Sequence, residues 1–221
     1  MKPAAFFDLD DTILVGTNSL LLYVRYLVRR GMMTRWDVGR GIFYSLLHKI
    51  NIINIEKLLD NFIAIYRDWD EQKLLNLTQD WFEKDVKFFL AAQASEKIAW
   101  HKAQGHPTIL LSNSSQYVCR PVAEHLKIDQ VLCSKVEVKD GRITGYLKKP
   151  LCYKEGKVLY AQQLAEQLHF NLKESYFYTD SISDLPMLEA VKNPIAVNPD
   201  PLLKRLAKKK KWPILYWDKT L

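Results

Sequence analysis

Cysteine is scarce in this sequence, and no cysteines have the spacing of a metal-binding or redox motif. The 221 residues include three cysteines, Cys119, Cys133 and Cys152, with no CxxC pair among them. An odd, widely spaced set indicates neither a disulfide framework nor a zinc site. We therefore expect a cytoplasmic protein, in a compartment where thiols stay reduced.

Long apolar runs are also missing. Only seven residues precede Asp8, too few for the core of a signal peptide. The most apolar stretches, residues 19–28 and 41–47, contain or adjoin Arg, His or Lys. A bilayer-spanning helix needs about 20 predominantly apolar residues. We therefore expect neither a signal peptide nor stable membrane insertion.

Basic residues outnumber acidic ones and give a net charge of +7. The run Lys208–Lys211 is an alternative sign of binding to nucleic acid or to an anionic membrane surface, which salt-sensitive binding to RNA or vesicles would reveal. It follows a predicted amphipathic helix, however, where a solvated basic end is more common. We expect no nucleic-acid partner and a positive field that favours anionic substrates. The sequence carries no indication of oligomeric state.

Short apolar runs alternate with helical periodicity along most of the chain. Strands are predicted at 4–9, 107–112, 131–138, 142–147, 176–179, 194–197 and 214–217, and helices at 17–31, 36–49, 55–67, 71–84, 91–104, 115–126, 154–168, 183–191 and 201–210. Asp140-Gly141 predicts a hairpin turn between two of the strands. The alternation predicts an α/β fold, a Rossmann-like doubly wound parallel sheet with an all-helical cap inserted after the first strand. We assign residues 1–16 and 86–221 to the core domain and residues 17–85 to the cap.

Three acids follow the first predicted strand directly, as Asp8, Asp10 and Asp11. Carboxylates this close repel one another unless a cation or a partner offsets their charge, so a divalent metal is a natural explanation. In extended geometry residues i and i+2 face the same side, which allows Asp8 and Asp10 to act on one substrate. The plain alternative is an acidic turn or helix cap.

Polar groups recur where later strands end. Ser112-Asn113 follows one strand, where hydroxyls and helix amides can hold an anion. Lys157 begins a helix and can bind a phosphoryl oxygen, with Lys154 as a competitor. Asp180 and Asp184 follow a further strand. Each motif alone has an ordinary interpretation as a cap or a solvated lysine, but together the acids, hydroxyl and lysine predict phosphoryl transfer.

Four segments of the sequence resemble, in this order, the four motifs of the haloacid dehalogenase superfamily: Asp8 to Thr12 (DLDDT), Ser112-Asn113, Lys157, and Asp180 to Asp184 (DSISD). The likeness is to subfamily IB, which is similar to phosphoserine phosphatase and carries a helical cap after the first motif, and it extends over nearly the whole chain. The resemblance implies a phosphatase that hydrolyses a small phosphorylated metabolite with Mg²⁺. A phosphotransferase using the same intermediate and a catalytically silent binding module are the alternatives.

The resemblance also implies roles for the acids. Asp8 attacks phosphorus and forms an aspartyl-phosphate, and Asp10 protonates the leaving oxygen and later activates water. Mg²⁺ is bound by the Asp8 side chain, the Asp10 backbone carbonyl and Asp180, with Asp184 supporting these ligands.

The remaining motif residues are implied to bind the substrate phosphate. These are Thr12, Ser112, Asn113 and Lys157. The sequence departs from phosphoserine phosphatases nine residues after the nucleophile, where Thr17 replaces a Glu that holds the substrate amine. Phosphoserine is therefore not the expected substrate, while histidinol phosphate or another amino-alcohol phosphate stays a candidate. Several basic residues of the cap can either bind anionic groups of the substrate or face solvent: Arg25, Arg29, Arg35, Arg40, His48 and Arg67.

Overall fold

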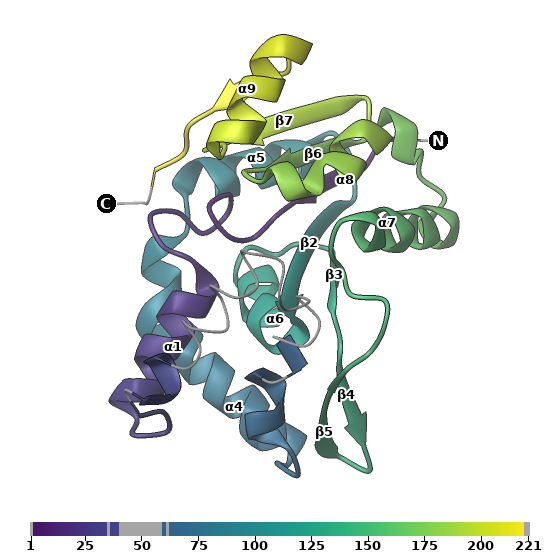
Figure 1. Ribbon diagram of the computed structural model, residues 1–221. Coiled ribbons are helices and arrows are strands. Elements are labelled where there is room, and N and C mark those ends of the chain that lie inside the picture. The colour runs from purple at the N-terminus through teal and green to yellow at the C-terminus, as the bar shows by residue number, and fades with distance from the viewer. Residues whose placement is uncertain (1, 35, 40–58, 61, 219–221) are drawn as a thin grey trace.

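A computed structural model describes residues 2–34, 36–39, 59–60 and 62–218. At its centre is a six-stranded sheet in the order β3-β2-β1-β6-β7-β8, in which every neighbouring pair runs parallel (Figure 1). The strands are β1 (Ala5–Phe7), β2 (Thr108–Ser115), β3 (Gln130–Ser134), β6 (Tyr176–Thr179), β7 (Asn193–Val197) and β8 (Ile214–Leu215). Because β1 lies in the interior of the sheet and is buried on both faces, its sequence is a continuous apolar run.

Helices cover both faces of this sheet. Phe7 packs in one apolar cluster with residues of α5 (Ala92–Ala103) and α6 (Gln116–His125). Its neighbour Phe6 packs in a second cluster on the opposite face. The helices that contribute to this second cluster are α7 (Glu155–Leu168), α8 (Leu185–Ala190) and α9 (Pro201–Lys210). The alternation of side chains along β1 therefore divides the core into two layers, as a doubly wound fold requires.

The described part of residues 17–85 is helical. It contains α1 (Ser19–Arg29), the 3-10 helix η1 (Ala64–Tyr66) and α4 (Glu71–Trp81), which a π-helix (Phe82–Val86) continues. Tyr23 of α1 packs edge-on against the fully buried Trp81, with ring centroids 5.1 Å apart. The predicted helices 36–49 and 55–67 lie partly outside the described residues. None of the described helices is long and apolar enough to cross a bilayer.

The predicted strand 131–138 is two strands in the structure. Its first part is β3, in the main sheet, and its second part, β4 (Val136–Lys139), pairs with β5 (Arg142–Leu147) in the predicted hairpin. Just beyond the end of β3, the Gln116 side chain accepts from the backbone N–H of Val136 and donates to its carbonyl. The hairpin then runs beside the helical insertion, where the Asp68 N–H donates to the Ile143 carbonyl at 2.8 Å. The division into a core domain of residues 1–16 and 86–221 and a cap of residues 17–85 stays a prediction.

A buried histidine lies behind the first and fourth motifs. His101 of α5 is fully buried, with Nε2 2.9 Å from the Tyr178 hydroxyl and Nδ1 3.0 Å from His106 Nδ1. Burial, then the charges of His106 and Lys97, lower the pKa of His101 from 6.5 to about 3. The folded protein therefore holds this imidazole neutral at physiological pH.

The folded protein should lose stability in mild acid, because His101 takes up a proton more readily in the unfolded chain. The pKa of His101 is lower in the folded state than in the unfolded state, so below pH 6.5 the unfolded chain takes up a proton that the folded protein does not. The free energy of unfolding is therefore highest above pH 6.5 and falls as the pH decreases toward 3. We expect wild type to lose about 1 to 2 kcal/mol more unfolding free energy between pH 7 and 5 than His101→Gln does. Urea unfolding of both proteins at the two pH values measures this difference. Equal losses would show that His101 does not titrate in this way.

Candidate active site

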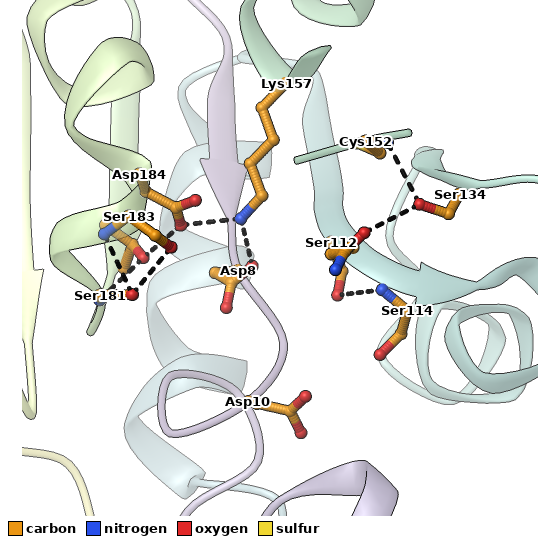
Figure 2. Close-up of polar contacts among 12 residues, drawn as sticks. Asp8, Asp10, Ser112, Ser114, Ser134, Cys152, Lys157, Ser181, Ser183 and Asp184 are labelled. Atoms are coloured by element: carbon orange, nitrogen blue, oxygen red, sulfur yellow. Dashed lines mark hydrogen bonds and ion pairs between the residues drawn. The ribbon is translucent and has the colours of Figure 1, made fainter. Parts of the chain in front are cut away.

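The four sequence motifs meet at the carboxyl edge of the parallel strands. Asp8 follows β1, Ser112 lies in β2, Asp180 follows β6 and Lys157 lies in the first turn of α7. All four side chains line one cavity of about 460 Å³, which α1 also borders. The neighbouring order of β2, β1 and β6 in the sheet explains why residues so distant in sequence converge (Figure 2).

Lys157 joins two of the acids. Its Nζ lies 2.7 Å from Asp8 Oδ1 and 2.7 Å from Asp184 Oδ2, and the side chain is almost wholly buried (Figure 2). Thr179 also donates to Asp184 Oδ2, at 2.7 Å. Burial acts to lower the pKa of Lys157, but Asp184 and Asp8 outweigh it and raise the pKa. Lys157 is therefore a fixed cation beside the predicted nucleophile.

The backbone at the start of α7 places Lys157, and not Lys154, in the site. A β-carbon at Gly156 would lie 1.9 Å from the Leu151 carbonyl oxygen, so only glycine allows this close approach. The next residue, Lys157, then points to Asp8. Lys154 is exposed outside the cavity, with its ammonium 5.4 Å from the centre of the Tyr153 ring.

Asp10 is held by the first residue of α1. Its Oδ1 accepts from the Ser19 N–H at 2.5 Å, and its Oδ2 accepts from the Ser19 hydroxyl at 2.9 Å. The same hydroxyl lies 3.3 Å from the Ser114 hydroxyl, which links the helix to the last residues of β2. Burial raises the pKa of Asp10, and the bonds from Ser19 partly offset this. Sequence reasoning missed Ser19, because a serine beginning a helix is commonly an ordinary cap.

The second motif places a hydroxyl and an amide in the lining of the same cavity as Asp8. Ser112 is buried, and its Oγ accepts from the Ser114 N–H at 3.2 Å, which leaves its own proton for another acceptor (Figure 2). The Asn113 side-chain oxygen accepts from Ser134 at 3.0 Å. Thr12 is fully buried behind the cavity rather than in its lining, and its hydroxyl has no hydrogen-bond partner in the part of the chain that the structure describes.

Asp180 lies near three other carboxylates. Burial, then Asp8, Asp11 and Asp184, raise its pKa to about 9. Its backbone carbonyl accepts from the Asp200 N–H at 2.8 Å, and the Asp200 carboxylate accepts from Ile182 at 2.7 Å. Asp200 therefore fixes the loop that carries Asp180, a role that the sequence motif did not reveal.

The acid set fits a divalent cation. Burial raises the pKa of Asp8 to about 7, with Lys157 opposing the rise and Asp184 and Asp10 adding to it. Asp8 and Asp180 both line the cavity, and burial together with neighbouring carboxylates raises the pKa of each, an effect that a bound cation would offset. Among the described residues no three His, Cys, Asp or Glu side chains form a ready metal cluster. The two carboxylates and the Asp10 carbonyl are nevertheless hard oxygen donors of the kind that Mg²⁺ takes together with water and substrate oxygens.

Comparison with known proteins places the chain in a family. Residues 5–189 match the sequence model of the haloacid dehalogenase-like hydrolases. A probable phosphatase of Mycobacterium tuberculosis is 30% identical over the whole chain and 77% of its own length. The histidinol-phosphatase of Neisseria meningitidis is 29% identical over 97% of this chain and 99% of its own.

Solved structures share the fold. A protein with unknown function from Bordetella pertussis Tohama I superposes with a TM-score of 0.90 at 26% identity, covering 97% of this chain and 98% of its own. A phosphoserine phosphatase solved as a phospho-aspartyl intermediate analogue has a TM-score of 0.68 at 19% identity, over 99% of this chain and 94% of its own.

The chain therefore belongs to the haloacid dehalogenase-like hydrolases. Within that family it is a phosphatase, similar to the phosphoserine phosphatases. The family, the fold class and the enzyme class predicted from the sequence are confirmed.

Proposed function

We propose that this protein is a Mg²⁺-dependent phosphatase that hydrolyses a small phosphomonoester, in the cytoplasm, through an aspartyl-phosphate on Asp8. The observation that carries the proposal is the position of Asp8, which lies in a cavity against the buried cation of Lys157, with Asp10 and Asp180 lining the same space. Carboxylates with a perturbed pKa beside a specific charged partner in a cavity are typical of functional sites.

Phosphate binding is assigned to the donors around Asp8. Lys157 offers charged N–H groups and Ser112 a hydroxyl proton to the phosphoryl oxygens, and Asn113 lines the same cavity. These donors lie where charge builds up during transfer, so they favour the transition state over the bound substrate. When bound, Mg²⁺ supplies positive charge that offsets the repulsion between Asp8 and the phosphate dianion.

The reaction then needs one nucleophile and one acid. Asp8 attacks phosphorus while the bond to the leaving oxygen breaks, and Asp10 gives that oxygen its proton. In the second step Asp10 takes a proton from water, the water oxygen attacks phosphorus, and inorganic phosphate leaves Asp8 restored. A raised pKa suits Asp10 to the acid role, and its bonds to Ser19 hold the carboxyl toward the cavity.

Removal of divalent metal should stop turnover. We expect phosphate release from a panel of small phosphomonoesters to fall roughly 10²-fold or more in EDTA, because the acid cluster then repels the substrate. Excess Mg²⁺ should restore the rate. A thermal melt in EDTA serves as the control that the fold persists. Release that is unchanged after metal removal would contradict the proposed metal dependence.

A further inference from the structure

The cavity has two sides of different chemistry. All of its charged residues belong to the segments that follow β1 and β6 and to α7. The residues of the helical insertion that line it are apolar or aromatic apart from Ser19, whose N–H and hydroxyl bond Asp10. The apolar and aromatic ones, here called the apolar wall, are Leu20, Tyr23, Leu59, Phe62 and Ile63. Burial raises the pKa of Tyr23 to about 12, so its ring stays uncharged at physiological pH.

The charged residues of the described insertion lie elsewhere. Arg29 pairs with Asp85, and Arg67 lies 5.2 Å over the Tyr146 ring. Arg25 is exposed and does not line the cavity. Among the described residues of 17–85, therefore, none that lines the cavity carries a charge. The candidates Arg35, Arg40 and His48 lie outside the described residues.

The acids of the core are already engaged, Asp180 through the Mg²⁺ that the proposed function assigns to it. Asp10 uses both carboxylate oxygens for Ser19, and Asp8 and Asp184 share Lys157. Thr17, in the position where phosphoserine phosphatases hold an amine, does not line the cavity. An ammonium or carboxylate on the leaving group would lose its water against the apolar wall without gaining a partner there, which is costly.

We propose that the alcohol part of the substrate is uncharged and mainly apolar, an alkyl or arylalkyl phosphate. This inference rests on the proposed phosphatase activity and names its substrate class. The phosphate lies at the charged end of the cavity and the hydrocarbon lies on the apolar wall, which it desolvates on binding.

A matched pair of substrates tests the inference. 3-Phenylpropyl phosphate and 2-amino-3-phenylpropyl phosphate share one skeleton and differ by an ammonium group. We expect kcat/KM to be roughly tenfold or more higher for the uncharged compound. Equal or better use of the amino compound would overturn the inference.

A second readout separates this inference from the proposed function. Oxygen exchange between ¹⁸O-labelled water and inorganic phosphate needs the phosphoryl site but no leaving group. Asp8-dependent exchange without use of either phenylpropyl compound would overturn the inference alone. Absence of both exchange and phosphate release would overturn the proposed function, and this inference with it.

Two neighbouring leucines give a variant and its control. Leu20 and Leu21 both lie in the first turn of α1 and are 55% and 41% exposed, but only Leu20 lines the cavity. A new acid in a first helical turn is favourable, so both glutamate variants should fold. Leu20→Glu should reduce or reverse the preference for the uncharged compound roughly tenfold or more, because the ammonium gains a partner. Leu21→Glu should keep the wild-type preference, and the same shift in both variants would contradict the assignment of the apolar wall.

Discussion

Replacement of Asp8 by asparagine is expected to reduce phosphate release roughly 10⁴-fold or more, as loss of a nucleophile does in other covalent enzymes. The amide has the shape of the carboxylate but cannot form the acyl phosphate. Lys157 keeps its ion pair with Asp184 and can still donate to the Asn oxygen, so the fold should persist. Steady-state phosphate release with Mg²⁺, together with a thermal melt, measures both effects.

Asp11→Asn is the matched control for this change. Asp11 lies three residues further along and does not line the cavity, and its φ of 52° is one that asparagine adopts readily. We expect its activity to stay within a few fold of wild type. Near wild-type release by Asp8→Asn, or equal loss in the two variants, would remove Asp8 from the role of nucleophile.

Loss of the Lys157 ammonium is expected to have the second largest effect. Lys157→Met keeps the apolar stem but leaves phosphoryl oxygens without a charged donor, which should cost on the order of 10² to 10³ in rate. The change also leaves Asp8 and Asp184 buried without their cation, so the unfolding free energy should fall by about 3 to 5 kcal/mol. Kinetics and urea unfolding of the same preparation separate the two effects.

Lys154→Met is the control, because Lys154 lies outside the cavity on the same turn of chain. Its rate and stability should match wild type. If Lys154→Met lost activity and Lys157→Met did not, the phosphate-binding lysine would have been placed wrongly.

Much of the fold could be predicted because the spacing of apolar residues along the sequence indicates which residues are buried. The buried run before Asp8 and the strand–helix alternation after it follow directly from apolar spacing. The convergence of four motifs followed from one rule, that parallel strands present their carboxyl ends at one edge. The break between β3 and β4 could not be predicted, because apolar spacing does not reveal that the backbone of Val136 bonds the side chain of Gln116 there.

The site was less predictable where one side chain orients another. Ser19 and Asp200 act through hydrogen bonds to Asp10 and to the loop of Asp180, and neither belongs to a motif with its own chemical signature. The apolar wall could not be predicted either, since leucine and aromatic residues at helical spacing are typical of core packing. Three-dimensional packing decides which of these residues face the cavity.

The most direct measurement is detection of the phosphorylated enzyme. Wild type and Asp8→Asn are mixed with a substrate found in the phosphomonoester panel, quenched in acid and reduced with borohydride, which converts an aspartyl-phosphate to homoserine. Peptide mass spectrometry then locates the change. We predict homoserine at position 8 in wild type and none in Asp8→Asn. Turnover without modification at position 8, or modification at another acid, would contradict the assignment of Asp8 as the nucleophile.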